Sequence, residues 1–372
     1  MWVGLCWPRW FLIGMLAPKR CKHGTGHTGV AFGLHSLVAT LTWGLLLSGG
    51  SSSTLLRFSL VRLMSQPAAH GTSSGAMGPR LLVSVRNAGE AAVALEGGVE
   101  LLDVKDPAAG SLGMPSPAVL SEIVACWRAV DTLLRPSLSV ALGEVVEWGA
   151  DCGRKEFVDV RDVGYVKLGT RSLCAAGTRF SDWSDRLQEA WAEVELVIER
   201  MPASAVRNAG TEQCEVTRPG RILVAYAEEG QVGAPSLDET LALAEAQQWD
   251  GLLIDTCLKS GRGLLTWQPP TRLTELAQRC REAGLLFGLA GQVAARDLPQ
   301  LVTVGADVIG IRSAACRQGE RNAEIDPREL FRFKRALREA VDLAYGPVTQ
   351  VVSRTSVAEP GTSCSTKAVS SP

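Results

Sequence analysis

The stretch RLLVSVRNAGEAAVALEGGVELLDVK, residues 80–105, holds two apolar strand-like segments with a helix-like segment between them. The middle segment spaces its apolar residues three or four apart, as an amphipathic helix does. Gly97 and Gly98 follow it, and glycine is a common residue at the end of a helix. A strand, a helix and a second strand in this order build parallel sheets. The stretch therefore predicts an α/β protein.

The same alternation continues along the chain. Six further apolar segments are predicted as strands, at 138–143, 163–169, 221–227, 250–256, 284–291 and 306–312. Helical patterns are expected at 117–132, 181–200, 237–248, 271–283, 295–304 and 327–343. Eight strands alternating with helices are typical of a (β/α)₈ TIM barrel. The alternative is a doubly wound open sheet, but its usual glycine-rich fingerprint does not follow the first predicted strand.

The two ends of the chain differ in composition from this segment. Residues 1–79 are predicted to be a separate extension, either disordered or translated upstream of a true start at Met64 or Met77. Its apolar stretch, 29–50, is also long enough for a signal segment or a marginal membrane span, so an anchor remains the alternative. Residues 347–372 are rich in Ser, Thr and Pro, which predicts a disordered tail. The catalytic domain is expected at 80–346.

Composition excludes several classes of protein. The formal net charge is -1 and no basic block is dense, which argues against a nucleic-acid partner. All four histidines precede the barrel segment, so neither a histidine triad nor a histidine-ligated metal is expected in it. The ten cysteines form no CxxC pair, which favours a reduced, cytoplasmic protein over a disulfide framework or a zinc site. Acid–base chemistry must then come from Lys, Asp, Glu, Tyr or Cys.

Lysine is rare in this chain, yet three of the five lysines in the barrel segment lie at or just beyond the ends of predicted strands. They are Lys105 after the second strand, Lys167 on the fourth and Lys259 beyond the sixth. Two carboxylates, Asp103 and Asp255, accompany them. Since barrel enzymes place catalytic groups at the C-terminal ends of their strands, we expect these five side chains to converge. For any single lysine, solvation or a structural ion pair is the alternative.

The choice of lysine over arginine indicates a nucleophile. Arginine stays protonated, whereas a lysine that is desolvated and surrounded by other cations can lose its proton and form a Schiff base with a carbonyl. We therefore expect Lys105 to be the nucleophile, with the neighbouring lysines lowering its pKa and acting as acid–base groups.

Three loops indicate an anionic substrate. Residues 108–113, 289–293 and 311–322 offer small residues, free backbone N–H groups and three arginines. The loops after strands 7 and 8 of barrels frequently bind phosphate. The predicted phosphate-binding residues are Ser111, Gly113, Gly291, Arg312 and Ser313.

Several of these segments are also parts of a family pattern. In chain order they are LLVSVRNAGEA, LLDVKDPAAGSLG, LSVALGE, YVKLG, LIDTCLKSG, GLAGQV and VIGIRSAACRQGERNAEID, spanning about residues 81 to 326. With them the chain resembles the (5-formylfuran-3-yl)methyl phosphate synthase family, also called 4-(hydroxymethyl)-2-furancarboxaldehyde-phosphate synthase. The resemblance covers the predicted barrel and neither end of the chain. Ser313 stands where the pattern leads us to expect glycine, and residues 144–160 fit it poorly.

The resemblance implies a lyase of methanofuran biosynthesis that condenses two molecules of glyceraldehyde 3-phosphate, releasing phosphate and water. It implies that Lys105 is the Schiff-base lysine and Lys167 the proton acceptor. Asp103, Asp255 and Lys259 would support them. Neither a metal nor an organic cofactor is expected. Membrane association is not expected either, and a homo-oligomer is possible. The alternatives are a different Schiff-base aldolase acting on sugar phosphates and a non-catalytic barrel that binds a phosphorylated metabolite.

Overall fold

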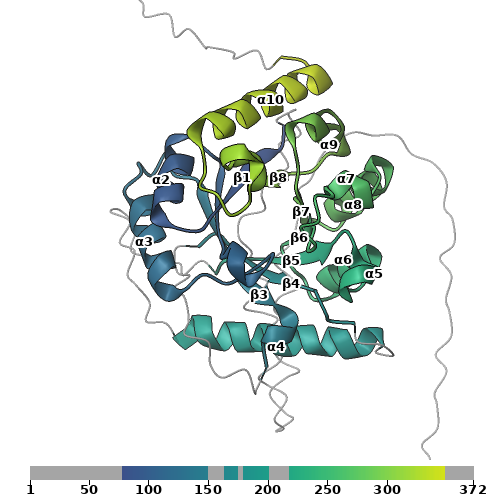
Figure 1. Cartoon of the computed structure of the whole chain (residues 1–372). Coiled ribbons are helices and arrows are strands. Elements are labelled where there is room, and N and C mark those ends of the chain that lie inside the picture. The colour runs from purple at the N-terminus through teal and green to yellow at the C-terminus, as the bar shows by residue number, and fades with distance from the viewer. Residues whose placement is uncertain (1–77, 150–162, 175–178, 201–217, 348–372) are drawn as a thin grey trace, which may run out of the picture. The chain divides into compact units, whose positions relative to one another are not determined.

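Eight parallel strands close into a barrel in chain order (Figure 1). The computed structural model describes residues 78–149, 163–174, 179–200 and 218–347. The strands are β1 (Arg80–Val85), β2 (Leu101–Val104), β3 (Ser137–Glu144), β4 (Tyr165–Gly169), β5 (Gly220–Tyr226), β6 (Gly251–Asp255), β7 (Leu286–Leu289) and β8 (Val308–Ile311). Because β1 pairs with both β2 and β8, the sheet has no edge. The TIM barrel is confirmed and the open sheet is excluded.

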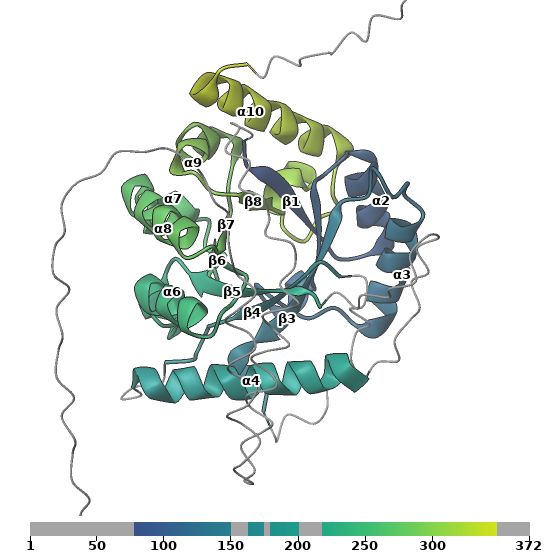
Figure 2. The same ribbon diagram turned by 180° about the vertical axis from the view of Figure 1, so that it is seen from behind.

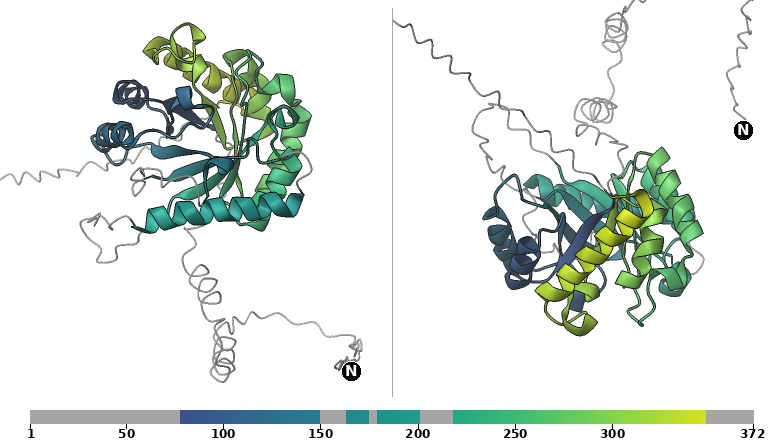
Figure 3. Two further views of the ribbon diagram at one scale, coloured as in Figure 1. Left: turned by 60° about the horizontal axis from the view of Figure 1, so that its bottom comes forward. Right: turned by 90° about the horizontal axis from the view of Figure 1, so that it is seen from above.

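Helices surround the strands on the outside of the ring (Figure 2). The longer ones are α2 (Ala88–Glu96), α3 (Pro117–Arg128), α4 (Phe180–Arg200), α6 (Leu237–Ala246), α8 (Pro270–Glu282), α9 (Leu298–Val304) and α10 (Pro327–Tyr345). Two single turns, α5 (Glu229–Val232) and α7 (Leu264–Trp267), were not expected from the sequence. The last helix, α10, packs against both α9 and α2 and so completes the ring (Figure 3).

Some of the helices begin at a side-chain cap. The side chain of Asn87 accepts the Glu90 amide at the start of α2, and Ser236 forms a capping box with Glu239 at the start of α6. The helix expected at 117–132 ends instead at Arg128. Just beyond it, the Asp131 carboxylate accepts the amide of Leu133 at 2.9 Å, a turn that competes with continued helix.

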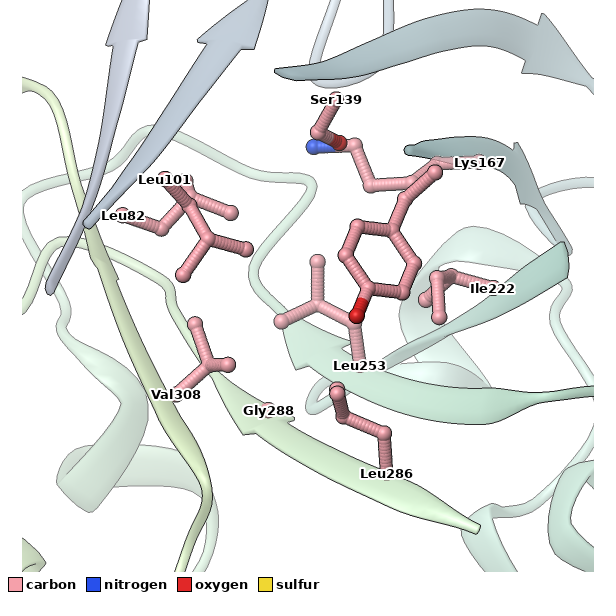
Figure 4. A pocket seen from close by; sticks show the side chains of 10 residues that line it. Leu82, Leu101, Ser139, Lys167, Ile222, Leu253, Leu286, Gly288 and Val308 are labelled. Carbon is pink, nitrogen blue, oxygen red and sulfur yellow. The ribbon is translucent and has the colours of Figure 1, made fainter. Parts of the chain in front are cut away.

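Side chains on alternate strand positions point into the barrel, and their character changes along its axis. At the N-terminal end of the strands they are mostly apolar and line a cavity, shown in Figure 4, with about 330 Å³ of empty space including its open side. Lys167 reaches this cavity from β4, as does Ser139 from β3. Toward the C-terminal end the inward residues include several charged ones. The polar site therefore lies above an apolar floor.

Two predictions fall largely outside the described residues. These are the N-terminal extension at 1–79, of which only residues 78 and 79 are described, and the tail at 347–372, of which only residue 347 is. The apolar stretch 29–50 lies there too. Within the described ranges, no helix is both long and apolar enough to cross a membrane.

Candidate active site

The alternation of side chains along β2 brings Asp103 and Lys105, the residue just after the strand, to one face. Asp103 and Lys105 are two positions apart, so both point into the barrel. Lys105 follows the last residue of the strand, and its amide still donates to the Val85 carbonyl at 3.1 Å, which extends the ladder. Its residue exposure is 8%, and that of Asp103 is 0%. Both are thus fixed by the sheet rather than carried on a free loop.

Lys167 lies on the middle of β4 and forms an ion pair with Asp103. The other oxygen of Asp103 accepts the Ser84 hydroxyl at 2.8 Å. Burial alone would raise the pKa of Asp103, but Lys167 and Lys105 outweigh burial and lower it. Asp103 is therefore a buried carboxylate that holds Lys167 in place.

Burial lowers the pKa of Lys105 to about 8, and the charges of Lys167 and Lys259 act in the same direction. Asp255, whose Oδ2 lies 3.9 Å from the Lys105 Nζ, and Asp103 oppose this without cancelling it. A lysine with such a pKa is partly neutral near physiological pH, so it can attack a carbonyl.

Asp255 ends β6 and connects Lys105 to Lys259. Its Oδ1 accepts the Thr256 amide at 2.7 Å and lies 3.4 Å from the Nζ of Lys259. Burial would raise the pKa of Asp255, but Lys259 and Lys105 lower it overall. Lys259 also donates to the Thr256 carbonyl, and its side chain is 25% exposed. It is the most accessible of the three lysines.

All five predicted catalytic residues line one pocket, with about 450 Å³ of empty space including its mouth. Three of the predicted phosphate-binding residues, Gly291, Arg312 and Ser313, line it as well. Gly291 has φ of +103°, and a Cβ there would lie 2.8 Å from the backbone N of Thr256. Only glycine fits easily, and this brings the loop after β7 close to the loop after β6.

Arg312 has buried protein partners. It donates two hydrogen bonds to Glu90, at 2.9 and 3.2 Å, and further ones to the carbonyls of Ser84 and Arg321. A guanidinium bound in this way mainly fixes the end of β8 to the start of α2. Its role in binding phosphate stays a prediction.

Arg321 is a better placed cation. It lines the pocket, and burial lowers its pKa while Asp255 opposes this. One of its N–H groups donates to the Gly110 carbonyl at 2.7 Å, which ties the β2–α3 loop to the loop after β8.

Ser111 and Gly113 do not line the pocket; both shape the β2–α3 loop. The Ser111 hydroxyl donates to the Thr256 carbonyl at 2.8 Å, across the barrel mouth. A Cβ on Gly113 would collide with the Asp106 carbonyl. These contacts account for both residues structurally, and their binding of phosphate stays a prediction.

Sequence reasoning missed four polar residues near this site. Ser84 and Gln292 line the pocket, and Glu144 bonds Tyr226 beside it. Ser84 and Tyr226 share the inward strand positions of Asp103 and Asp255, so the register of an expected barrel could have found them. Within the described ranges, no group of three or more metal-ligating side chains gathers. The prediction that no metal or cofactor is needed stays untested.

A family model and the relatives found by sequence agree on one family. A model of the 4-HFC-P synthase family matches residues 81–334. The chain is 31% identical over 249 residues to the (5-formylfuran-3-yl)methyl phosphate synthase of Methanopyrus kandleri, covering 66% of this chain and 93% of that protein. The synthase of Methanothermobacter thermautotrophicus is 31% identical over 264 residues, with 70% and 98% covered.

A bacterial relative shows the same extent of match. The putative (5-formylfuran-3-yl)methyl phosphate synthase of Methylorubrum extorquens is 28% identical over 262 residues, covering 70% of this chain and 92% of that protein. The matched region holds strands β2 to β8, all of β1 but Arg80, and every residue of the pocket, and it ends within α10. The chain belongs to the 4-HFC-P synthase family of enzymes.

Proposed function

We propose that the protein is a Schiff-base lyase that condenses two molecules of glyceraldehyde 3-phosphate into (5-formylfuran-3-yl)methyl phosphate, with loss of phosphate and water. The observation that carries the proposal is Lys105, a buried lysine whose pKa is lowered to about 8 inside a pocket shared with two other lysines. Membership of the 4-HFC-P synthase family supports the proposal, and the triose phosphate substrate is the one that the sequence resemblance implies.

Lys105 would begin the reaction. Its neutral amine adds to the carbonyl of one triose phosphate, and loss of water from the adduct leaves an iminium. The iminium withdraws electrons from the adjacent carbon and so acidifies its proton. Lys167 lines the same pocket from β4, with Asp103 as its counter-ion, and we assign proton transfer to it.

Asp255 and Lys259 would assist the later steps. Asp255 sits between Lys105 and Lys259 and contacts both, so a proton released at one lysine can be taken up near the other. Lys259 is exposed enough to exchange protons with solvent. Aldol addition, dehydration and phosphate loss each require such transfers.

The substrate phosphates would bind where the loops after β7 and β8 meet. Gly291, Ser313 and Arg321 line that part of the pocket, and Arg321 supplies a positive charge. Arg312 would act mainly by supporting this loop through Glu90. A cytoplasmic location and self-association remain predictions.

Borohydride trapping tests the nucleophile. The full chain is incubated with glyceraldehyde 3-phosphate, reduced, digested and analysed by mass spectrometry, with the Lys105→Arg variant as the matched control. We expect the mass increase on Lys105 and none in the control. Label on another lysine, or no label, would overturn the assignment.

The product separates this function from that of another aldolase using the same lysines. A conjugated furan aldehyde absorbs in the near ultraviolet, whereas a sugar phosphate does not. Trapping on Lys105 without a furan product would favour the alternative aldolase. Binding of the triose phosphate with neither trapping nor turnover would favour a non-catalytic barrel.

A further inference from the structure

A carboxyl group and a phenol lie together at the same end of the barrel as the lysines. Glu144 is the last residue of β3 and Tyr226 the last residue of β5. Exposure is 2% for Glu144 and 0% for Tyr226. Tyr226 is in register with Asp255 on β6, so the phenol begins at the level of an active-site carboxylate. Neither residue has a place in the chemistry described above.

Glu144 connects the pair to Arg171, whose side chain is partly exposed to solvent. Tyr226 donates to the Oε1 of Glu144 at 2.6 Å, and the Oε2 of Glu144 accepts the Arg171 amide at 3.1 Å. The Nε of Arg171 lies 3.7 Å from Oε1, and the Arg171 side chain is 37% exposed. The order from barrel interior to surface is therefore phenol, carboxyl, guanidinium.

Room for this pair is made by a glycine on the strand between them. A Cβ on Gly169 of β4 would collide with Glu144 and would lie 2.7 Å from both the Tyr226 hydroxyl and the Leu112 side chain. Any other residue at this position would displace one of the three. The strand is thus shaped to let the carboxyl and the phenol meet.

The pKa of each of the two groups is raised. Burial raises the pKa of Glu144, although Tyr226 and Arg171 oppose it, and burial together with Glu144 raises the pKa of Tyr226 well above its ordinary value. The ionisable groups that act on the pair are Arg171, Glu147, Cys257 and Asp255. A carboxyl with a raised pKa takes up a proton more readily than an ordinary one, which proton transfer to the phenol requires.

Tyr226 does not itself line the lysine pocket, but it packs in a cluster beside it. Tyr226 packs in one cluster with Leu253 and Ala290, both of which line that pocket. Leu112, from the β2–α3 loop, packs in the same cluster. Contact between the Tyr226 hydroxyl and a bound substrate therefore requires a movement within this cluster, because Tyr226 is fully buried.

We propose that Tyr226 and Glu144 form a proton relay that protonates an oxygen of the substrate held at Lys105. The inference rests on the proposed function and adds an acid to it, which loss of water requires. The phenolic O–H breaks as a new O–H forms on the departing hydroxyl. The Glu144 carboxyl proton then passes to the phenolate, and water restores it to Glu144, whose carboxylate Arg171 stabilises meanwhile. One proton moves inward from solvent, and nothing is oxidised.

The test separates iminium formation from later protonation. In the Tyr226→Phe variant we expect borohydride labelling of Lys105 within about 3-fold of the unaltered protein, and furan formation reduced about 100-fold or more, the usual contribution of a general acid. Glu144→Gln keeps the hydrogen-bond partner but carries no proton to pass on, so it should also lose turnover and keep labelling. Tyr345→Phe is the matched control, since it removes a phenol that donates to the Val302 carbonyl on the outer surface.

A further variant of Tyr226 tests whether the loss of turnover comes from proton transfer or only from packing. Difluorotyrosine placed at position 226 keeps the ring and the hydroxyl but makes the phenol more acidic. A relay predicts a changed rate of furan formation with unchanged thermal stability, and a packing role predicts no change in rate. Turnover by Tyr226→Phe within about 3-fold of the unaltered protein would overturn the relay. Absence of Lys105 label in the unaltered protein would overturn the proposed function and the relay together.

Discussion

Lys105 combines burial, neighbouring cations and two nearby carboxylates. Burial and the two lysines favour its neutral form, while Asp103 and Asp255 prevent its pKa from falling further. This balance suits a nucleophile that must also stabilise a positive iminium once the bond forms. The same carboxylates that oppose deprotonation of the free amine then lie beside the cationic intermediate.

The pH dependence of trapping follows from this environment. Only the neutral amine attacks, so labelling should be weak below pH 7, rise through a midpoint near the Lys105 pKa of about 8, and level off above it. Brief incubation at each pH followed by reduction and mass spectrometry measures the midpoint. Lys334, which donates to two backbone carbonyls on the outside of the barrel, serves as the reference lysine. A midpoint near the ordinary lysine value would contradict the assigned environment.

Arg321 allows a test of phosphate binding. Replacing it with Met removes a charged donor from the pocket, so we expect the KM for a phosphorylated substrate to rise about 10-fold or more, as loss of one charge-assisted hydrogen bond predicts. Arg321→Lys should recover part of this because it keeps the charge.

The matched control for Arg321 is a neighbour on the same loop. Arg317→Met removes a 65% exposed arginine whose ion-pair partner is Glu324, and it should leave KM unchanged. Equal KM values for Arg321→Met and the unaltered protein would show that phosphate binds elsewhere.

The lysines could be located from the sequence because the period of a strand fixes which side chains share a face. Asp103, Lys105 and Lys167 needed only the strand positions and the closure of the barrel. Arg312 shows what such reasoning lacks. Its partner Glu90 is 222 residues away on α2, and no local pattern indicates that the two meet. Glu144 escaped notice for the same reason, whereas the register of Tyr226 with Asp255 could have indicated Tyr226.

At the level of elements, the Arg312–Glu90 pair joins the end of β8 to the start of α2. Both side chains are at least 95% buried, and the contact is bidentate. Loss of one partner from a buried pair leaves the other uncompensated, so Arg312→Met should lower the free energy of unfolding by about 3 kcal/mol. Chemical denaturation of the purified protein measures it.

A double variant shows whether the loss of stability comes from leaving one buried charge unpaired. Glu90→Met combined with Arg312→Met removes both charges and should recover much of the loss, because no buried charge remains. Arg86, the other partner of Glu90, is 30% exposed and can be solvated. If Arg312→Met left stability unchanged and raised only KM, Arg312 would be a binding residue rather than a structural one.

At the level of the whole chain, the order of elements was predictable because each strand and helix carries its own apolar period and caps. The exact ends of the strands and helices were less predictable. The strand expected at 306–312 ends at Ile311, which places Arg312 just beyond it. The path of the β2–α3 loop could not be foreseen, since its anchors Thr256 and Arg321 lie on distant loops.

Closure of the barrel makes a sharp prediction about its first strand. β1 pairs with β2 along one side and with β8 along the other, starting at Arg80. A chain that begins at Met77 keeps every strand and Gly78, which lies against Val341 of α10. We expect it to fold and to form the furan product at the rate of the full chain.

A chain that begins at Val85 lacks nearly all of β1, so β2 and β8 would each expose an unpaired edge and the protein should be insoluble. Sedimentation, circular dichroism and the furan assay on both chains measure these outcomes. Loss of activity in the chain beginning at Met77 would show that residues 1–76 contribute to the enzyme, and the apolar stretch 29–50 would then be the first segment to test.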